Sequence, residues 1–260
     1  IRGHRIHYLE RSGEGPTILM LCSTGLDPRQ WTGALRRLPE RRAIGPHYLG
    51  YPPSEPWRGD GTPDIEIDYL AAEALLLAEP EPVDILAHSY GGYIGLHLAA
   101  KHPERVRRIA AHEPTAWGTL KESGREDLIE DFKRVTDVFF ESESAPEDFL
   151  RHFVDYWNVP GFWDAMPEQR QAGWRVLYPK IRAEAQLLCL EETGLSFYRA
   201  IEHPTLITLS PDTPPHHFVV CTQLAEAMPH AEIVHVPGAH MGVITHPHEV
   251  LAPLVDWLSR

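Results

Sequence analysis

Ser89 is a candidate nucleophile. It lies in the sequence AHSYGG (residues 87–92), between an apolar run typical of a buried strand and a segment of helical composition. A hydroxyl on such a turn is lifted above the sheet, and the first amides of the helix point toward its reaction partner. Small residues two positions before and after it, here Ala87 and Gly91, let the strand and helix backbones approach. The pattern indicates a nucleophilic Ser89; the alternative is that Ser89 only caps the helix.

A histidine near the end of the chain is the candidate base. His240 lies in the sequence PGAHMG, directly after the last strand-like run, and Gly238 and Gly242 on either side of it favour a mobile loop. A serine hydroxyl is a weak nucleophile, and a positioned imidazole activates it by taking its proton. The two motifs together predict a serine–histidine pair for acyl transfer.

Two carboxylates are candidates for the third role. Glu113 follows the run 106–112, and Asp212 follows the run 204–210. Side chains at the carboxyl ends of parallel strands lie where open α/β sheets bind their ligands. A carboxylate there fixes the tautomer of the imidazole and stabilises the imidazolium. Glu113 could instead cap the next segment, which begins with Pro114.

Strand-like runs alternate with helix-length segments along most of the chain. We expect strands at residues 5–11, 17–22, 42–49, 83–88, 106–112, 204–210 and 232–236. We expect helices at residues 31–38, 65–78, 93–102, 218–228 and 248–258. This alternation predicts an α/β fold with a mostly parallel central sheet and helices on both faces.

The strand signal disappears over residues 117–201 and helical segments replace it. We therefore expect an α/β core of residues 1–116 and 202–260, interrupted by a helical cap at 117–201. So long an excursion typically forms a lid over a site. The segment carries four tryptophans: Trp117, Trp157, Trp163 and Trp174. They favour an apolar ligand pocket, unless each packs only the core of the insertion.

These features resemble the α/β-hydrolase fold over nearly the whole chain. The sequence AHSYGG is similar to the nucleophile elbow of that family, G-x-S-x-G, with Ala87 in place of the first glycine. The order serine, acid, histidine also matches. The resemblance implies that Ser89 is the nucleophile and His240 the base, and that the reaction needs no cofactor.

The same resemblance ranks the two acids. Many members carry the acid as G-x-x-D after the later strand, but here that register places Thr213 at the aspartate position and Asp212 one step early. The His-Glu-Pro sequence at residues 112–114 resembles a subgroup, including fungal lactone hydrolases, whose triad acid is a glutamate at this site. We therefore favour Glu113 over Asp212.

Two backbone amides for an oxyanion are implied as well. The first is the N–H of Tyr90, the residue after the nucleophile. The family takes the second from the loop after an early strand, where a His-Gly pair precedes the donor. Here Cys22 and Ser23 stand at those two positions, and Thr24 stands at the donor position.

Composition excludes several other classes of protein. The chain has 260 residues, enough for one large α/β domain, and a formal net charge of −13 that disfavours nucleic acid and anionic membrane as partners. It has no apolar run of the ~18 residues that a membrane helix needs. The three cysteines, Cys22, Cys189 and Cys221, have unrelated spacings that favour a reducing, cytoplasmic setting.

Motifs for metals and nucleotide cofactors are missing from the sequence. There is no H-E-x-x-H, no phosphate-binding G-x-x-x-x-G-K-[ST], and no G-x-G-x-x-G after an expected strand. The neighbouring histidines His216 and His217, and the pair His246 and His248, are taken as surface or structural residues. We expect neither a metal nor a cofactor.

The sequence thus predicts a serine hydrolase that cleaves a carboxylic ester or lactone of a medium-sized, largely apolar small molecule through an acyl-enzyme. A carbon–carbon bond hydrolase or a perhydrolase could use the same triad. Epoxide hydrolases and haloalkane dehalogenases are disfavoured because they need a carboxylate where this chain has Ser89. An alternative of another class is a receptor that binds a small molecule on a hydrolase scaffold without turnover.

Overall fold

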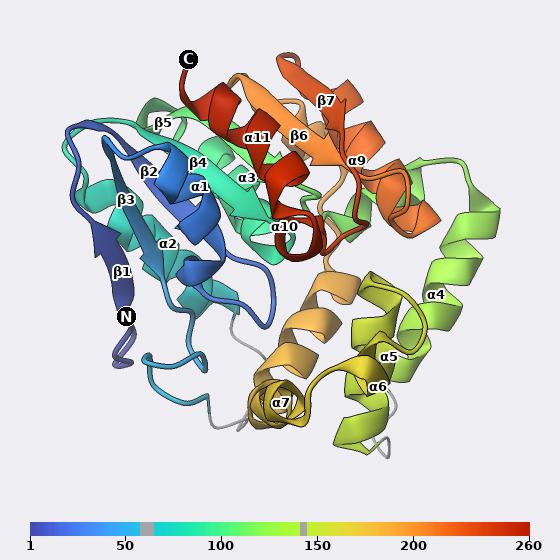
Figure 1. Ribbon diagram of the computed structural model, residues 1–260. Coiled ribbons are helices and arrows are strands. Elements are labelled where there is room, and N and C mark those ends of the chain that lie inside the picture. The colour runs from blue at the N-terminus through green and yellow to red at the C-terminus, as the bar shows by residue number, and fades with distance from the viewer. Residues whose placement is uncertain (58–64, 141–144) are drawn as a thin grey trace.

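The computed structural model describes residues 1–57, 65–140 and 145–260. Within them, strands form one sheet in the order β1-β3-β2-β4-β5-β6-β7 (Figure 1). The strands are β1 (Tyr8–Arg11), β2 (Gly15–Leu21), β3 (Arg41–Pro46), β4 (Val83–His88), β5 (Val106–His112), β6 (Thr205–Leu209) and β7 (Ala231–His235). β1 is antiparallel to β3, and all other neighbours are parallel. The predicted α/β fold with a mostly parallel sheet is confirmed.

The central strands are apolar along their length because both faces of the sheet are covered. Every residue of β4 is buried, and burial extends over the last four residues of β5. β1 is the edge strand, and its residues alternate between exposed and half-buried. It is shorter than the predicted strand at 5–11, and β3 ends at Pro46 rather than at residue 49.

Helices lie on both faces of the sheet. α1 (Thr32–Arg37), which follows the short helix η1 (Pro28–Trp31), packs with α11 (Pro247–Leu258) on one face. α2 (Ile65–Ala78) and α3 (Tyr90–Lys101) pack together on the other, and α9 (Pro215–Ala227) lies along β6 and β7. The short helices η2 (Pro103–Arg105) and α10 (Gly242–Thr245) precede β5 and α11. α3 begins three residues earlier than predicted, directly after Ser89.

Between β5 and β6 the chain leaves the sheet and forms helices. They are η3 (Trp117–Glu122), α4 (Glu126–Phe140), α5 (Pro146–Trp157), α6 (Phe162–Ala165), α7 (Glu168–Leu190) and α8 (Leu195–Tyr198), and we call α4 to α8 the inserted helices. Figure 1 shows α4 to α7 gathered beyond one edge of the sheet. No described helix has the length and apolar character needed to cross a membrane.

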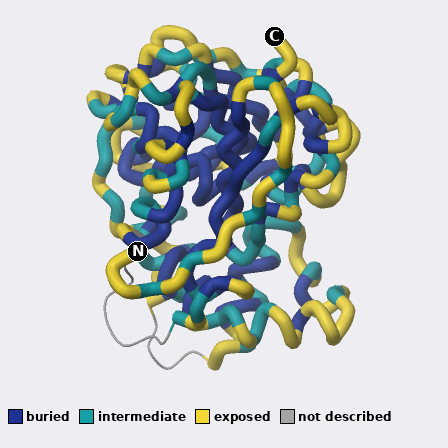
Figure 2. The backbone as a smooth tube through the Cα atoms, turned by 90° about the vertical axis from the view of Figure 1, so that its left-hand side faces the viewer, coloured by how far each residue is buried: buried dark blue, intermediate teal, exposed yellow. Residues whose placement is uncertain are grey.

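The inserted helices share a core with the sheet. Buried residues of α5 and α7, such as Phe149 and Ile181, belong to the same apolar cluster as Ile18 of β2 and Leu86 of β4. Figure 2 shows this buried backbone running from the sheet into the inserted helices, with exposed segments around its edge. The insertion thus packs against the sheet at the carboxyl ends of its strands.

Candidate active site

Ser89 occupies the sharp turn between β4 and α3. Its backbone has φ 53°, a left-handed conformation that L-residues rarely adopt and that functional sites often retain. A Cβ on Gly91 would lie 2.4 Å from the carbonyl carbon of Leu21, so only glycine fits there. Ala87 is fully buried, and its Cβ lies 3.8 Å from where a Cβ on Gly95 would stand, an ordinary contact. Alanine therefore serves at the position where the family motif has glycine.

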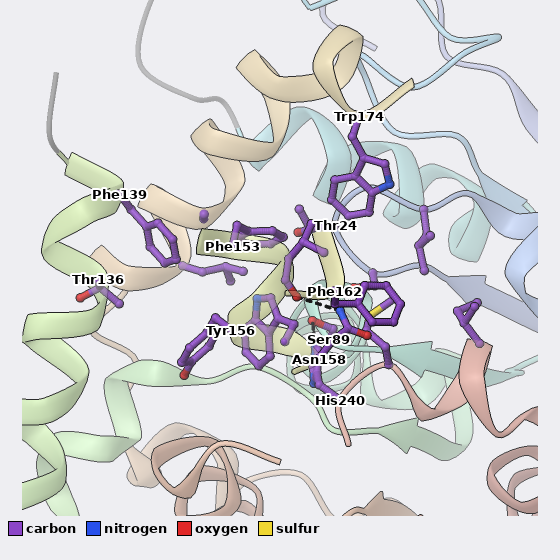
Figure 3. A pocket seen from close by; sticks show the side chains of 18 of the residues that line it. Thr24, Ser89, Thr136, Phe139, Phe153, Tyr156, Asn158, Phe162, Trp174 and His240 are labelled. Atoms are coloured by element: carbon purple, nitrogen blue, oxygen red, sulfur yellow. Dashed lines mark hydrogen bonds between the residues drawn. The ribbon is translucent and has the colours of Figure 1, made fainter. Parts of the chain in front are cut away.

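Ser89, His240 and Glu113 form a continuous chain of hydrogen bonds. Ser89 Oγ lies 2.8 Å from His240 Nε2, and His240 Nδ1 lies 2.9 Å from Glu113 Oε2. Ser89 and His240 face each other at the base of a cavity (Figure 3). All three side chains are buried. The structure thus brings together residues that follow β4, β5 and β7 at the carboxyl edge of the sheet, where the sequence analysis expected them.

The carboxylate of Glu113 is held by the loop after β6. Its Oε1 accepts the Ser210 N–H at 2.8 Å, and its Oε2 accepts the Thr213 hydroxyl at 2.7 Å. Thr213 thus occupies the position of the family's aspartate and orients the glutamate instead. Asp212 is exposed, and within the described residues its carboxylate has no hydrogen bond to His240. Of the two candidate acids, the structure places Glu113 at the imidazole.

His240 is buried among aromatic rings. The ring of Trp157 lies 3.9 Å from the imidazole, centroid to centroid, and His217 meets its edge at 4.9 Å. Burial, and secondarily His112, hold the pKa of His240 well below its usual range. The imidazole is therefore neutral near pH 7 and able to accept the proton of Ser89.

The amide of Thr24 is free to meet an oxyanion. The N–H of Ser23 is taken by the Gln30 side chain at 3.3 Å, and the N–H of Gly25 donates to the Tyr51 hydroxyl at 2.9 Å. The Thr24 N–H between them has no partner among the described residues. Tyr90 contributes the first N–H of α3, an amide without an acceptor inside the helix. These are the two donors that the sequence analysis singled out.

A cavity of about 370 Å³ opens above Ser89, Thr24 and His240. Its walls are mostly aromatic rings from the inserted helices: Phe132, Phe139, Phe153, Trp157, Phe162 and Trp174. Figure 3 shows it reaching from Trp174 and Thr24 toward Phe139 and Thr136. Among the described residues that line it, only Arg170 is charged.

The four tryptophans of the insertion divide between the two roles left open by the sequence. Trp117, Trp157 and Trp174 line the cavity. Trp163 is fully buried away from the lining, and its Nε1–H donates to Glu147 at 3.0 Å. Both interpretations of these residues therefore hold, each for different members.

Sequence reasoning missed His217 as part of the site. Its Nε2 lies 3.2 Å from the backbone oxygen of Glu113 and 3.8 Å from Glu113 Oε2. Glu113 itself has φ 42°, so a hydrogen bond to its carbonyl stabilises a strained turn. Glu113, His217 and His240 are also grouped closely enough to bind a metal ion. A metal ligated by both His240 and Glu113 would displace their mutual hydrogen bond, so the geometry fits the proton-transfer arrangement better.

Acid should destabilise the fold. Burial lowers the pKa of the imidazoles of His88, His112, His217 and His240, for His217 to about 3. In the unfolded chain each of these imidazoles has a pKa of ~6.5. Below that pH the unfolded state binds more protons, so stability is complete above about pH 6.5 and declines as pH falls, by up to ~1.4 kcal/mol per pH unit for each such residue.

Urea unfolding between pH 7.5 and 5, followed by tryptophan fluorescence, measures this decline. We expect the midpoint to fall steadily below about pH 6.5. His217→Asn should flatten the slope, whereas replacing the exposed His248 by Asn should leave it unchanged. A midpoint that is constant over this range would contradict the prediction.

Comparison with known proteins gives consistent matches. A family model described as alpha/beta hydrolase fold matches residues 17–247. A 2-hydroxymuconate semialdehyde hydrolase from Pseudomonas putida is 29% identical, over 98% of this chain and 90% of the relative. The enol-lactonase from Burkholderia xenovorans has a TM-score of 0.72 and 20% identity, over 100% of this chain and 98% of that chain. An esterase from Exiguobacterium antarcticum has a TM-score of 0.75 and 16% identity, over 100% and 97%.

The two solved structures share the fold with this chain, and the sequence relative is a hydrolase by name. The residues that the family model matches include most of the sheet and the whole insertion. They also include Ser89, Glu113 and His240. The prediction of a hydrolase on this fold is confirmed at that level. The chain belongs to the alpha/beta hydrolase fold family.

Proposed function

We propose that this chain is a serine hydrolase that cleaves a carboxylic ester or a lactone through an acyl-enzyme. The observation that carries the proposal is the unbroken hydrogen-bond chain from Ser89 Oγ through His240 to Glu113. Each group has the state that the reaction requires: a buried hydroxyl, a neutral imidazole and a carboxylate on its far nitrogen.

The reaction begins when Ser89 Oγ attacks the carbonyl carbon and His240 Nε2 takes the hydroxyl proton. Glu113 stabilises the resulting imidazolium through Nδ1–H. The negative oxygen of the tetrahedral intermediate accepts hydrogen bonds from the backbone N–H groups of Thr24 and Tyr90. Each such donor lowers the barrier by ~3–4 kcal/mol. His240 then protonates the leaving alcohol, and water cleaves the acyl-enzyme with His240 again as base.

The cavity supports a medium-sized, largely apolar substrate. The polar groups on its wall are mostly occupied, since the Thr136 hydroxyl donates to the Phe132 carbonyl at 2.9 Å and the Tyr156 hydroxyl pairs with His216 Nδ1 at 3.0 Å. They therefore present apolar surface to a ligand. An aromatic-lined cavity of this size suits a ring or a short acyl chain. The structural similarity to an enol-lactonase and to an esterase supports the same substrate class.

We further propose that residues 117–201 act as a cap over a core of residues 1–116 and 202–260. The inserted helices supply most of the cavity wall, whereas Ser89 and His240 come from the ends of core strands. The cap would therefore choose the substrate while the core carries out the bond cleavage.

A second candidate reaction, carbon–carbon bond hydrolysis, would use the same triad. The sequence similarity to a 2-hydroxymuconate semialdehyde hydrolase is the observation that favours it. Assaying a vinylogous diketone alongside esters and lactones distinguishes the two reactions, because the proposal requires turnover of the ester or lactone to exceed that of the diketone.

A fluorophosphonate probe tests the proposed function directly. It should label the enzyme at Ser89, identified by mass spectrometry of the tryptic peptide, and heat-unfolded protein should not react. A series of p-nitrophenyl esters and lactones of increasing acyl length should then show an optimum at medium length, set by the limited volume of the cavity. No labelling, together with no ester or lactone turnover, would overturn the proposal.

A further inference from the structure

A buried cluster of charges joins the inserted helix α7 to the core beside the candidate active site. Lys180 and Glu184 lie one turn apart on α7, with Lys180 Nζ 3.5 Å from Glu184 Oε1. Lys180 Nζ also donates to Asp68 Oδ2 of α2 at 2.6 Å. All three side chains are buried, with exposures of 0% for Asp68, 2% for Glu184 and 6% for Lys180. Burying charges is costly, so a cluster of this kind needs a reason to be retained.

Tyr51 connects this cluster to the loop that carries Thr24. Its hydroxyl donates to Glu184 Oε2 at 2.8 Å and accepts the N–H of Gly25 at 2.9 Å. The peptide group of Gly25 directly follows Thr24, whose own N–H has no partner among the described residues. The Tyr51 hydroxyl therefore fixes the peptide group next to the Thr24 N–H. Glu184 of the insertion in turn holds that hydroxyl.

The other oxyanion donor is linked to the same cluster. The hydroxyl of Tyr90 donates to Asp68 Oδ2 at 2.9 Å, and the N–H of Leu49 donates to Asp68 Oδ1 at 2.9 Å. The residue whose backbone follows Ser89 is thus tied to the carboxylate that binds Lys180. Both donor positions converge on a single ion cluster.

The electrostatics agree with this geometry. Burial raises the pKa of Glu184 to about 7, while Lys180 and hydrogen bonds from Thr24 and Tyr51 act in the opposite direction. Burial also raises the pKa of Tyr51, so its hydroxyl stays protonated and can donate.

We infer that Tyr51 and Glu184 are positioning residues for the oxyanion amide of Thr24, so that helix α7 of the insertion holds the Thr24 loop in its reactive geometry. The inference rests on the proposed function, because it assigns a role to an amide that only a tetrahedral intermediate would use. A displacement of the Thr24 N–H by about 1 Å would weaken its hydrogen bond to the oxyanion strongly. This bond forms fully only in the transition state, so the loss would appear in the rate.

The variant Tyr51→Phe tests the inference because it removes one hydroxyl and keeps the ring. With a good p-nitrophenyl ester we expect kcat to fall about 10- to 100-fold and KM to change less than about threefold. Tyr69→Phe is the matched control: its hydroxyl also contacts a glutamate, Glu73 at 3.4 Å, but on the outer part of α2. That variant should keep the wild-type kcat.

A boronic acid separates positioning from a merely structural role. Phenylboronic acid forms a tetrahedral adduct with a nucleophilic serine, and one of its oxygens takes the oxyanion position. Its inhibition constant should rise in Tyr51→Phe by the same factor as kcat/KM falls, whereas the affinity for benzoate, which resembles a product, should stay constant. Glu184→Gln should show the same parallel change, smaller in size because the amide oxygen still accepts from Tyr51.

The outcomes distinguish this inference from the proposed function. If Tyr51→Phe keeps full kcat and boronate affinity while Ser89→Ala is inactive, only the positioning role is wrong. If kcat falls without a parallel loss of boronate affinity, the cluster merely anchors α7, which also refutes the inference. If fluorophosphonate fails to label Ser89 in the wild-type enzyme and no ester or lactone is turned over, the proposed function itself fails.

Discussion

Replacing Ser89 by alanine is expected to lower kcat by at least about 10³-fold on any ester that the wild-type enzyme cleaves. The variant loses the proposed nucleophile but keeps the Thr24 and Tyr90 amides, so residual turnover is expected to come from binding and oxyanion stabilisation alone. The fold should survive, because Ser89 Oγ bonds only to His240 and, at 3.3 Å, to the Thr115 hydroxyl among the described residues.

Pre-steady-state kinetics with an excess of a p-nitrophenyl ester provides the measurement. Wild-type enzyme should release a burst of p-nitrophenol equal to the concentration of active sites, and Ser89→Ala should release none. Ser259→Ala is the control and should retain the burst, because among the described residues the Ser259 hydroxyl bonds only to the Val255 carbonyl of α11. A burst of normal size in Ser89→Ala would identify a different nucleophile.

Glu113→Gln is expected to reduce kcat by about 10²- to 10⁴-fold. An amide at this position can donate toward Nδ1 of His240, which favours the tautomer that cannot accept the serine proton. The conserved shape keeps one of the bonds to Ser210 or Thr213, so the loss should appear in catalysis more than in folding. Asp212→Asn, at an exposed position away from the imidazole, should change kcat by less than about twofold.

The comparison of these two variants assigns the acid. Circular dichroism and urea unfolding of Glu113→Gln establish that the protein is folded before kinetics are compared. The ratio of kcat between the two variants is then the decisive quantity. Equal activities, or a larger loss in Asp212→Asn, would show that the later loop supplies the acid.

Local sequence was enough to predict the strands that position the site. β4 and β5 coincide with the predicted runs because a strand buried on both faces is apolar throughout, and the turn after β4 carries the small residues that its geometry requires. Ends of elements were less predictable. The predicted helix at 31–38 corresponds to α1, with only Trp31 in the preceding η1, and Pro46 ends β3 early, since those boundaries depend on capping and tertiary contacts.

Contacts between distant segments could not be predicted from one sequence. His217 reaches Glu113 from α9, and Tyr51 reaches Glu184 from a loop after β3, although no motif marks either residue. Both depend on how α7 and α9 pack against the sheet, which periodicity does not determine. The family resemblance favoured Glu113 over Asp212 as the acid, and the structure adds that the side chain of Glu113 faces His240.

The ion cluster under α7 has a consequence for how such enzymes diverge. Insertions are often treated as exchangeable modules, so that a new cap grafted onto an old core brings a new specificity and leaves the reaction rate alone. Here helix α7 of the insertion carries Glu184, whose carboxylate reaches the backbone next to Thr24 through the hydroxyl of Tyr51. If the inserted helices of a chimaera lack this carboxylate, we therefore expect its kcat to fall as its specificity changes. Directed evolution should then restore kcat through mutations around Tyr51 and residue 184.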